Sequence, residues 1–415
     1  MLDRVYFKTG VKLIDMVLGG EKGVYGDPAG KIIRVCGDKS TGKTFICNEF
    51  IANAYWTYGK KFKWMYADCE RGYSFDTQPL YGFDVWTPES DAPENVEEAF
   101  YCINKFAESL KSDEFGIYVL DSLDALTSDE QDKRAEERLD AIEKGKEMKG
   151  TYGMGKAKYL SQEFFPQLCK VIEDKNILLI IVSQIRDNTD MFSFEKFSVS
   201  GGKAFDFYCY MTFWLATAKK YTYNEGDNEV ILGGTNILKV TKGKVPRPYR
   251  KCFYTYYFAR GIDNVETGVD YLFNIRTKTG DISKGVECAW ENDPTKKPMT
   301  IANIKDWLVE NKWYEDYRNT LEKGERASME TMLKFVKSDE KIKKLFDDTF
   351  NLCMDRDTLI TYIYENGLEE ELDRRVEEKW EAFEERAAAQ VTSRGGKYAK
   401  FYGDQPKSTA PAETI

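Results

Sequence analysis

Short runs of β-branched and aromatic residues alternate with longer helical patterns over residues 30–280. This alternation is typical of a mostly parallel sheet covered by helices, so it predicts an α/β core. Helices are expected near residues 43–58, 93–111 and 157–174. The predicted strands are Lys31–Cys36, Phe62–Asp68, Gly116–Asp121, Ile177–Ser183, Tyr208–Ala216, Asn236–Thr241 and Cys252–Ala259.

The pattern divides the chain into five segments. A stretch rich in Gly, Asp, Pro and Lys follows the core and predicts a linker. Beyond it the apolar spacing becomes helical, and one stripe predicts a packing face: Leu368, Leu372, Val376, Trp380, Phe383 and Ala387. The polar end of the chain favours disorder. The segments are an N-terminal segment (1–28), the core (29–280), the linker (281–300), a smaller helical C-terminal domain (301–390) and a tail (391–415).

The composition excludes several classes of enzyme. The 415 residues include no histidine, so His-dependent hydrolases, zincins and proton relays are excluded because each needs an imidazole. The nine cysteines are scattered without a C-x-x-C pair, which favours reduced, mostly buried thiols over a zinc site. The formal charge is -10, and no apolar run is long enough to span a bilayer. We therefore expect a cytoplasmic protein with no membrane partner.

The strongest local motif predicts a phosphate-binding loop. It is Gly37-Asp38-Lys39-Ser40-Thr41-Gly42-Lys43-Thr44, a complete G-x-x-x-x-G-K-[ST] between a predicted strand and a predicted helix. In such a loop backbone N–H groups surround the phosphates of a nucleotide. Lys43 is expected to contact the β- and γ-phosphate oxygens, and the Thr44 hydroxyl to ligate Mg²⁺.

Two acidic residues end predicted strands at the edge where this loop lies. Asp121 ends the apolar run Gly116–Asp121 and is the candidate second anchor for the metal, the Walker B carboxylate. Glu70 follows the run Phe62–Asp68, whose end lies at the same carboxyl edge. In the absence of histidine a carboxylate is the natural base for the attacking water, so Glu70 is the candidate catalytic base.

Several dispersed segments carry further motifs: Thr9–Gly20, Pro28–Lys31, Ile177–Arg186, Met191–Phe192, Ser200–Ala204, Phe207–Tyr208, Thr241–Pro246 and Arg260–Asp263. In this order they resemble motifs of the RecA family of DNA strand-exchange ATPases. The resemblance covers about residues 9–275 and implies a RecA-like P-loop NTPase core. Among family members the chain looks most like the bacteriophage UvsX-type recombinases, which would place it in a host cytoplasm or a DNA-associated compartment.

The resemblance implies a role for each matching position. ATP and Mg²⁺ would bind at the loop, with Lys43, Glu70 and Gln184 as catalytic residues. Gln184 would sense the γ-phosphate and couple it to a DNA-binding loop. Lys242 and Lys244 would reach the ATP of a neighbouring subunit.

Two loops are expected to bind DNA, at 146–158 and 185–201. The first has four lysines against one glutamate, and the second places aromatic residues beside basic ones. Basic groups with interleaved aromatic rings suit single-stranded DNA, although acidic residues in the second loop leave an ordinary surface loop as the alternative. The candidate DNA-binding residues are Met154, Lys156, Lys158, Arg186, Phe192, Lys196 and Lys203.

The sequence thus predicts an ATP-dependent recombinase that promotes homologous pairing and strand exchange, with DNA-stimulated ATP hydrolysis. The expected partners are single-stranded DNA, homologous duplex DNA and further copies of the chain in a filament. Only about eight residues precede Thr9, where family members carry a docking element, so the element that would join subunits stays open. Two alternatives also remain: a ring helicase or translocase with the same core, and a non-catalytic ATP-binding architectural or loader protein.

Overall fold

The computed structural model describes residues 5–19, 22–88, 90–144, 155–187, 197–199, 202–283, 285–291, 293–322 and 324–392. Its strands are β1 (Tyr6–Phe7), β2 (Asp27–Pro28), β3 (Ile32–Gly37), β4 (Phe62–Asp68), β5 (Phe115–Asp121), β6 (Ile177–Asp187), β7 (Phe197–Val199), β8 (Met211–Glu225), β9 (Asn228–Gly243), β10 (Lys251–Tyr257), β11 (Gly261–Asp263), β12 (Cys288–Ala289), β13 (Lys297–Pro298), β14 (Phe350–Asn351) and β15 (Cys353–Met354).

Its helices are α1 (Lys12–Leu18), α2 (Lys43–Tyr58), the 3-10 turn η1 (Gly59–Lys61), α3 (Gln78–Tyr81), α4 (Val96–Ser109), α5 (Asp129–Glu143), α6 (Gly155–Tyr159), the π-helical turn η2 (Leu160–Phe164), α7 (Phe165–Asp174), α8 (Gly202–Tyr208), α9 (Asn264–Leu272), α10 (Ile301–Glu310), α11 (Tyr314–Thr320), α12 (Met329–Lys337), α13 (Glu340–Thr349), α14 (Arg356–Asn366) and α15 (Glu369–Thr392). Most of the predicted tail lies outside the described residues.

A nine-stranded sheet forms the centre of the molecule, in the order β11-β10-β9-β8-β3-β6-β5-β4, with β7 beside β6. Strands β8, β3, β6, β5 and β4 are parallel to one another. Strands β9, β10 and β11 extend this sheet in antiparallel pairs. The predicted α/β core with a large parallel sheet is confirmed. The hydrophobic pattern did not distinguish the antiparallel strands β9, β10 and β11 from the parallel ones.

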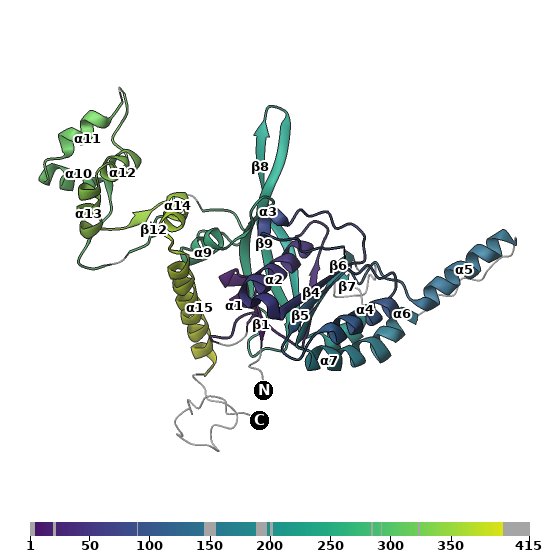
Figure 1. Cartoon of the computed structure of the whole chain (residues 1–415). Helices are drawn as coiled ribbons and strands as arrows, with labels where there is room; N and C mark the ends of the chain where they lie inside the picture. The colour runs from purple at the N-terminus through teal and green to yellow at the C-terminus, as the bar shows by residue number, and fades with distance from the viewer. Residues whose placement is uncertain are drawn as a thin grey trace, which may run out of the picture.

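Helices cover both faces of this sheet (Figure 1). Ile33 and Val35 of β3 belong to the apolar cluster shared with α1, α2 and α9, whereas Ile32 belongs to the cluster shared with α4 and α7. Because successive side chains of a strand point to opposite faces, a strand covered on both sides needs apolar residues at nearly every position. This explains why β3, β5 and β6 appear in the sequence as short continuous apolar runs.

The β8–β9 hairpin is much longer than the predicted strands. The predicted strand Tyr208–Ala216 starts too early, because Tyr208 is the last residue of α8. Both strands also extend to a tight turn at Gly226, and the hairpin projects from the body in Figure 1. Its outer residues are exposed on both faces, so they lack the apolar alternation that indicates a half-buried strand.

Helix α5 is a second projecting element, and the sequence pattern did not predict it (Figure 1). Its first turn carries Asp129, Glu130 and Asp132. Carboxylates at this position stabilise the helix because the N-terminal end of its dipole is positive. Leu139 and Ile142 are exposed near its other end. The helix is mostly polar, and its described side chains are exposed or only partly buried, so it lacks the buried apolar face that a packed helix shows.

The segment predicted as a linker contains two short strands. Within it β12 pairs with β15 and β13 pairs with β14. Cys288 is fully buried and Trp290 is nearly so, with the guanidinium of Arg375 lying 4.0 Å from the centre of the Trp290 ring. Part of this segment is therefore fixed by packing against residues near 350 and by α15.

The C-terminal helices pack in two places. Helices α10 to α13 surround their own apolar cluster, which includes Trp307, Tyr317 and Phe346. Helix α15 instead places Leu372 and Val376 in the cluster beneath the sheet. The predicted packing stripe is thus buried in its first part, whereas its last members, Phe383 and Ala387, are exposed.

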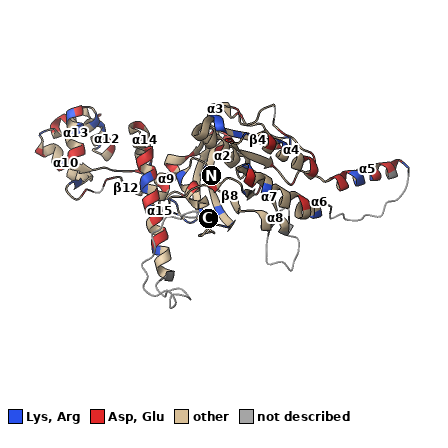
Figure 2. Cartoon of the chain, turned by 60° about the horizontal axis from the view of Figure 1, so that its bottom comes forward, with Lys and Arg blue, Asp and Glu red and all other residues tan. Residues whose placement is uncertain are grey.

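Figure 2 shows acidic residues at many positions along α15. Some of them connect the helix to the N-terminal part of the chain and to the loop before β10. Glu377 accepts a hydrogen bond from the Lys12 ammonium at 2.6 Å and from the Tyr25 hydroxyl at 2.7 Å. Glu384 accepts one from the Arg250 guanidinium at 2.8 Å. These contacts join segments more than a hundred residues apart.

All nine cysteines are free thiols, five of them buried and four partly buried. Burial raises the pKa of every one of these thiols, to about 12 for Cys36 and to about 11 for Cys102 and Cys288.

Of the helices in the described ranges, not one combines the length and the apolar character needed to cross a lipid bilayer.

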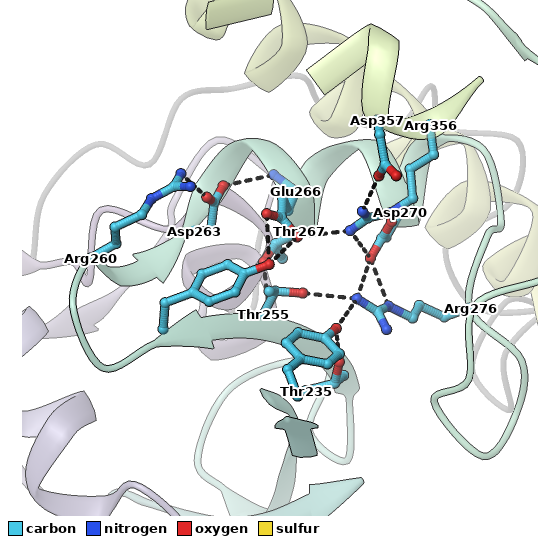
Figure 3. A network of polar contacts seen from close by, with 12 residues as sticks. Thr235, Thr255, Arg260, Asp263, Glu266, Thr267, Asp270, Arg276, Arg356 and Asp357 are labelled. Carbon is cyan, nitrogen blue, oxygen red and sulfur yellow. Dashed lines mark hydrogen bonds and ion pairs between the residues drawn. The ribbon is translucent and has the colours of Figure 1, made fainter. Parts of the chain in front are cut away.

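A buried ion-pair network holds α14 against the core (Figure 3). Asp270 of α9 is only 4% exposed, and its two carboxylate oxygens accept hydrogen bonds from Arg356 and Arg276, both at 2.6 Å. Arg356 also donates to Glu266 at 2.8 Å, and Arg276 donates to the Thr255 hydroxyl of β10 at 2.9 Å. Each buried charge in the network has a partner, as burial in a medium of low polarity requires.

We predict that Arg356→Ala lowers the free energy of unfolding by about 3–5 kcal/mol, because the buried Asp270 carboxylate loses one of its cations. Urea denaturation followed by tryptophan fluorescence measures the change. Arg374→Ala is the matched control, since Arg374 pairs with Glu371 and Glu378 on the surface of α15 and its loss should leave the free energy of unfolding nearly unchanged. Equal losses in the two variants would contradict a special role for the buried network.

Two buried aspartates near the N-terminus have opposite surroundings. The Asp15 carboxylate accepts hydrogen bonds from the Thr9 backbone N–H and hydroxyl, both at 2.7 Å, and from the Gly10 N–H at 3.2 Å. Asp27 is completely buried, and neither of its oxygens has a hydrogen-bond partner among the described residues. Burial raises the pKa of Asp15 to about 6 and raises that of Asp27 well above its ordinary value.

We predict that Asp27→Asn stabilises the protein at neutral pH. The folded protein keeps Asp27 protonated to a higher pH than the unfolded chain does, so this carboxyl lowers the free energy of unfolding as the pH rises above about 3.9. Asparagine has nearly the same shape as aspartic acid and does not ionise. The variant should therefore unfold at a higher urea concentration than the wild type at pH 8, and this difference should shrink towards pH 4. Asp15→Asn should destabilise at pH 8, since it replaces one of the two oxygens that accept from Thr9 and Gly10 by an NH2 group, which cannot accept. A gain there, or no gain for Asp27→Asn, would refute this explanation.

Candidate active site

The parallel strands bring four polar segments to one edge of the sheet. Gly37, where β3 ends, pairs with Gln184 of β6, and Asp68 at the end of β4 pairs with Asp121 at the end of β5. Glu70 follows two residues after Asp68. Because parallel strands end on the same side, the carboxyl edge collects side chains from distant parts of the sequence.

The phosphate-binding loop connects β3 to α2 through positions that require glycine. Gly42 has a φ of 81°, a left-handed conformation, and directly precedes α2. A Cβ atom at Gly37 would lie 2.4 Å from the Thr41 Oγ1 atom. The Lys43 ammonium donates to the carbonyl oxygens of Gly37 and Asp38 at 3.1 and 2.7 Å, and burial lowers its pKa.

Asp121 is nearly buried and receives two hydroxyl groups on one oxygen. Its Oδ2 atom accepts hydrogen bonds from the Thr44 hydroxyl at 2.8 Å and from the Tyr66 hydroxyl at 2.6 Å. Burial raises the pKa of this carboxyl. The contact with Thr44 joins the end of β5 to the first turn of α2.

Glu70 lies beside Gln184 at the same edge. Its Oε1 atom accepts hydrogen bonds from the Ser122 hydroxyl at 2.6 Å and from the Gln184 side-chain amide at 2.9 Å. The backbone N–H of Gln184 donates to the Asp124 carboxylate at 2.8 Å. The carboxylate of Glu70 is therefore oriented by residues that follow β5 and by β6.

These groups line one pocket of about 350 Å³. Lys43, Thr44, Asp121, Glu70 and Gln184, which the sequence placed at a common edge, all border it. The remaining lining residues are Lys39, Ser40, Thr41, Gly42, Phe45 and Phe75.

Lys242 and Lys244 lie away from this pocket. Lys242 of β9 pairs with Thr212 at the start of β8, beside the beginning of β3, whereas the phosphate-binding loop follows the end of β3. The Lys242 ammonium donates to the Cys209 carbonyl at 2.9 Å, and burial lowers its pKa. The backbone N–H of Lys244 donates to the Tyr210 carbonyl at 2.9 Å.

The predicted DNA-binding residues are only partly visible. Met154, Phe192 and Lys196 lie outside the described residues. The backbones of Arg186 and Lys203 belong to β6 and α8.

The two lysines of α6 differ in their surroundings. Lys158 is exposed, whereas the Lys156 ammonium donates to the carbonyl oxygens of Leu123 and Leu126 at 2.8 and 2.6 Å. Lys156 thus already binds the loop after β5, which distinguishes it from the exposed Lys158.

The sequence interpretation missed four residues that shape the site: Tyr66, Ser122, Phe75 and Asn236. A tyrosine directly between Met65 and Ala67 near the end of β4 was a usable signal, because a buried hydroxyl needs a partner. The role of Asn236 was not readable from the sequence, since it lies 195 residues from its partner. Its side-chain amide donates to the Thr41 carbonyl in the phosphate-binding loop at 3.0 Å.

The chain is similar to several known proteins. Residues 4–263 match the RecA N-terminal domain family. Among curated proteins, Protein RecA of Mycoplasma mobile is 26% identical over 305 residues, which cover 74% of this chain and 82% of that protein. DNA repair protein recA homolog 1, chloroplastic, of Arabidopsis thaliana is 25% identical over 264 residues, or 64% of this chain and 54% of that protein. Among solved structures, the RadB recombinase aligns with a TM-score of 0.42 and 18% identity, covering 62% of this chain and 98% of that one.

We predict that Asn236→Ala weakens nucleotide binding about fivefold, because the Thr41 carbonyl loses a hydrogen bond that contributes about 1 kcal/mol. Isothermal titration calorimetry with ADP and Mg²⁺ measures the change. Asn228→Ala, at the exposed tip of the same hairpin strand, is the matched control and should leave the affinity unchanged. Unaltered binding in Asn236→Ala would show that the loop does not depend on this support.

Proposed function

The chain belongs to the RecA family, and on that premise we propose that it is an ATP-dependent DNA recombinase. It would bind single-stranded DNA and homologous duplex DNA, promote pairing and strand exchange, and hydrolyse ATP in response to DNA. RecA-family proteins are ATPases of the P-loop type. What we propose for this chain is which DNA substrates it acts on and which of its residues bind and hydrolyse ATP.

The contact between Gln184 and Glu70 is the observation that carries the proposal. Gln184 lies on β6, which ends at Asp187, inside the segment 185–201 that was predicted as the second DNA-binding loop. Its amide donates to the candidate base at 2.9 Å. A γ-phosphate in the pocket would compete with Glu70 for this amide, because both are anionic acceptors within its reach. Nucleotide and DNA loop would thus be linked through one side chain.

The residues of the pocket fit a nucleotide with a hard divalent cation. The Thr44 hydroxyl and the Asp121 carboxylate lie next to each other, and oxygen atoms are the ligands that Mg²⁺ prefers. Among the described residues, the Lys43 ammonium donates its hydrogen bonds to backbone carbonyls of the loop, and a phosphate oxygen can replace these partners. Thr44 and Asp121 would hold Mg²⁺, which would neutralise charge on the β- and γ-phosphates.

In the proposed mechanism Glu70 accepts the proton of the attacking water. Ser122 and Gln184 donate to its Oε1 atom and so fix the orientation of the carboxylate. The Oε2 atom would then accept the proton of the water. Lys43 contacts the phosphates. The ring of Phe75, 40% exposed at the pocket, offers a surface for the nucleotide base.

Lys242 and Lys244 would act on the nucleotide of a neighbouring copy. Their position beside the start of β3, away from the loop of their own chain, supports a role between subunits. A head-to-tail arrangement would bring this end of one sheet to the carboxyl edge of the next. We therefore include self-association on DNA, as a filament, in the proposed function.

We predict that single-stranded DNA stimulates ATP hydrolysis and that Lys43→Ala and Glu70→Gln both abolish the stimulated rate. Loss of a general base costs about 10²–10⁴-fold, and Glu70→Gln should still bind ATP because the phosphate contacts remain. A coupled ATPase assay with and without DNA, together with nucleotide titrations, measures both effects. Glu136→Gln on the exposed surface of α5 is the control for removing one carboxylate.

Hydrolysis that is indifferent to single-stranded DNA would refute the proposal. Closed rings in electron micrographs together with unwinding of a forked duplex would indicate a helicase instead. DNA binding without turnover at any DNA concentration would indicate a non-catalytic loader or architectural protein.

A further inference from the structure

Tyr66 contributes a buried hydroxyl to the candidate metal site without bordering the pocket. Its side chain is fully buried on β4, where its ring meets the edge of Tyr73 at 4.8 Å between ring centres. Its hydroxyl donates to the Oδ2 atom of Asp121 at 2.6 Å. Packing on all sides fixes the ring, so the hydroxyl has one position from which to donate.

Asp121 Oδ2 therefore lies between two hydroxyl donors, Tyr66 at 2.6 Å and Thr44 at 2.8 Å. The Thr44 hydroxyl directs its proton at the carboxylate of Asp121. The lone pairs of the Thr44 Oγ1 atom are therefore left for a cation. This arrangement depends on a fixed Asp121, because a rotated carboxylate would release the Thr44 proton. Besides Thr44, the group that opposes this rotation is Tyr66, which lies 55 residues before Asp121 in the sequence.

We propose that Tyr66 is a positioning residue for the Mg²⁺-nucleotide complex, acting through Asp121 and Thr44. The inference rests on the proposed function and deepens it, because it assigns the metal dependence of binding to a residue with no ligand contact of its own. Groups that orient metal-binding side chains typically change metal affinity by about 10–100-fold when they are removed.

The next strand supplies a matched control. Tyr118 of β5 is also fully buried, and its hydroxyl donates to the Asp91 carboxylate at 2.8 Å. It lies in the apolar cluster on the opposite face of the sheet from Tyr66. Tyr118→Phe therefore removes the same hydroxyl from the same kind of buried tyrosine–carboxylate pair, away from the nucleotide pocket.

The test compares ADP binding by calorimetry in Mg²⁺ and in EDTA. For Tyr66→Phe we expect the gain in affinity from Mg²⁺ to fall about tenfold, with affinity in EDTA unchanged. In ATPase assays the Mg²⁺ concentration for half-maximal rate should rise while the rate at saturating Mg²⁺ is largely restored. Tyr118→Phe should match the wild type in all three measurements.

A double-mutant cycle with Asp121→Asn tests the route of the effect. If Tyr66 acts through Asp121, then Tyr66→Phe should change Mg²⁺ dependence little in the Asp121→Asn background. Equal losses of affinity in Mg²⁺ and in EDTA, or a full effect in that background, would overturn the inference. Tyr66→Met, a smaller and flexible apolar side chain without a hydroxyl, replaces Tyr66→Phe if the latter does not fold.

The outcomes separate this inference from the proposed function. The calorimetry needs no hydrolysis, so a wild type that binds Mg²⁺-ADP but shows no DNA-stimulated turnover contradicts the proposed function and leaves the Tyr66 comparison valid. Wild-type affinity that ignores Mg²⁺ overturns both. An unchanged Mg²⁺ effect in Tyr66→Phe, with DNA-stimulated hydrolysis intact, overturns the Tyr66 inference alone.

Discussion

Parallel pairing of the central strands is the constraint on which the candidate site depends. The pairs Gly37 with Gln184 and Asp68 with Asp121 place four strand ends at one edge. A shift of one residue between two strands would turn every side chain to the opposite face of the sheet. Since both faces are covered by apolar clusters, such a shift is costly, and the polar residues at the edge keep a fixed order. The stability of the core and the geometry of the pocket thus have the same origin.

Buried ionisable groups occur at several places in the molecule, and their hydrogen-bond partners differ from one place to the next. At the pocket, the buried Asp121 carboxylate accepts two hydrogen bonds, one from Thr44 of α2 and one from Tyr66 of β4. In the network around Asp270, guanidinium groups play the same part and attach the C-terminal helices to the core. Asp27, in contrast, has no partner among the described residues, and its burial opposes ionisation instead of supporting it.

Some of this architecture was readable from the sequence and some was not. The helix at 43–58 and the strand Phe62–Asp68 have the predicted bounds, because the phosphate-binding motif marks where α2 begins and Gly59, with a φ of 56°, marks where it ends. The outer hairpin and α5 were missed because exposed elements lack an apolar pattern.

The same difference applies to the site. The sequence predicted Lys43, Asp121 and Glu70 for one edge of the sheet, because Lys43 belongs to a complete motif and the two acidic residues end or follow predicted strands; all three border the pocket. Tyr66 and Asn236 were missed because their partners lie in other strands or loops, and which residues face each other across a sheet is decided by register and packing.

The buried thiols have a practical consequence for spectroscopy. Thiolate, and not thiol, reacts with maleimides and iodoacetamides, and burial raises the pKa of all nine native cysteines. A single cysteine introduced at the exposed tip of the β8–β9 hairpin, for example Asn228→Cys, would therefore be the fastest-reacting thiol in the chain. A fluorophore could be attached there at neutral pH with every native cysteine left in place.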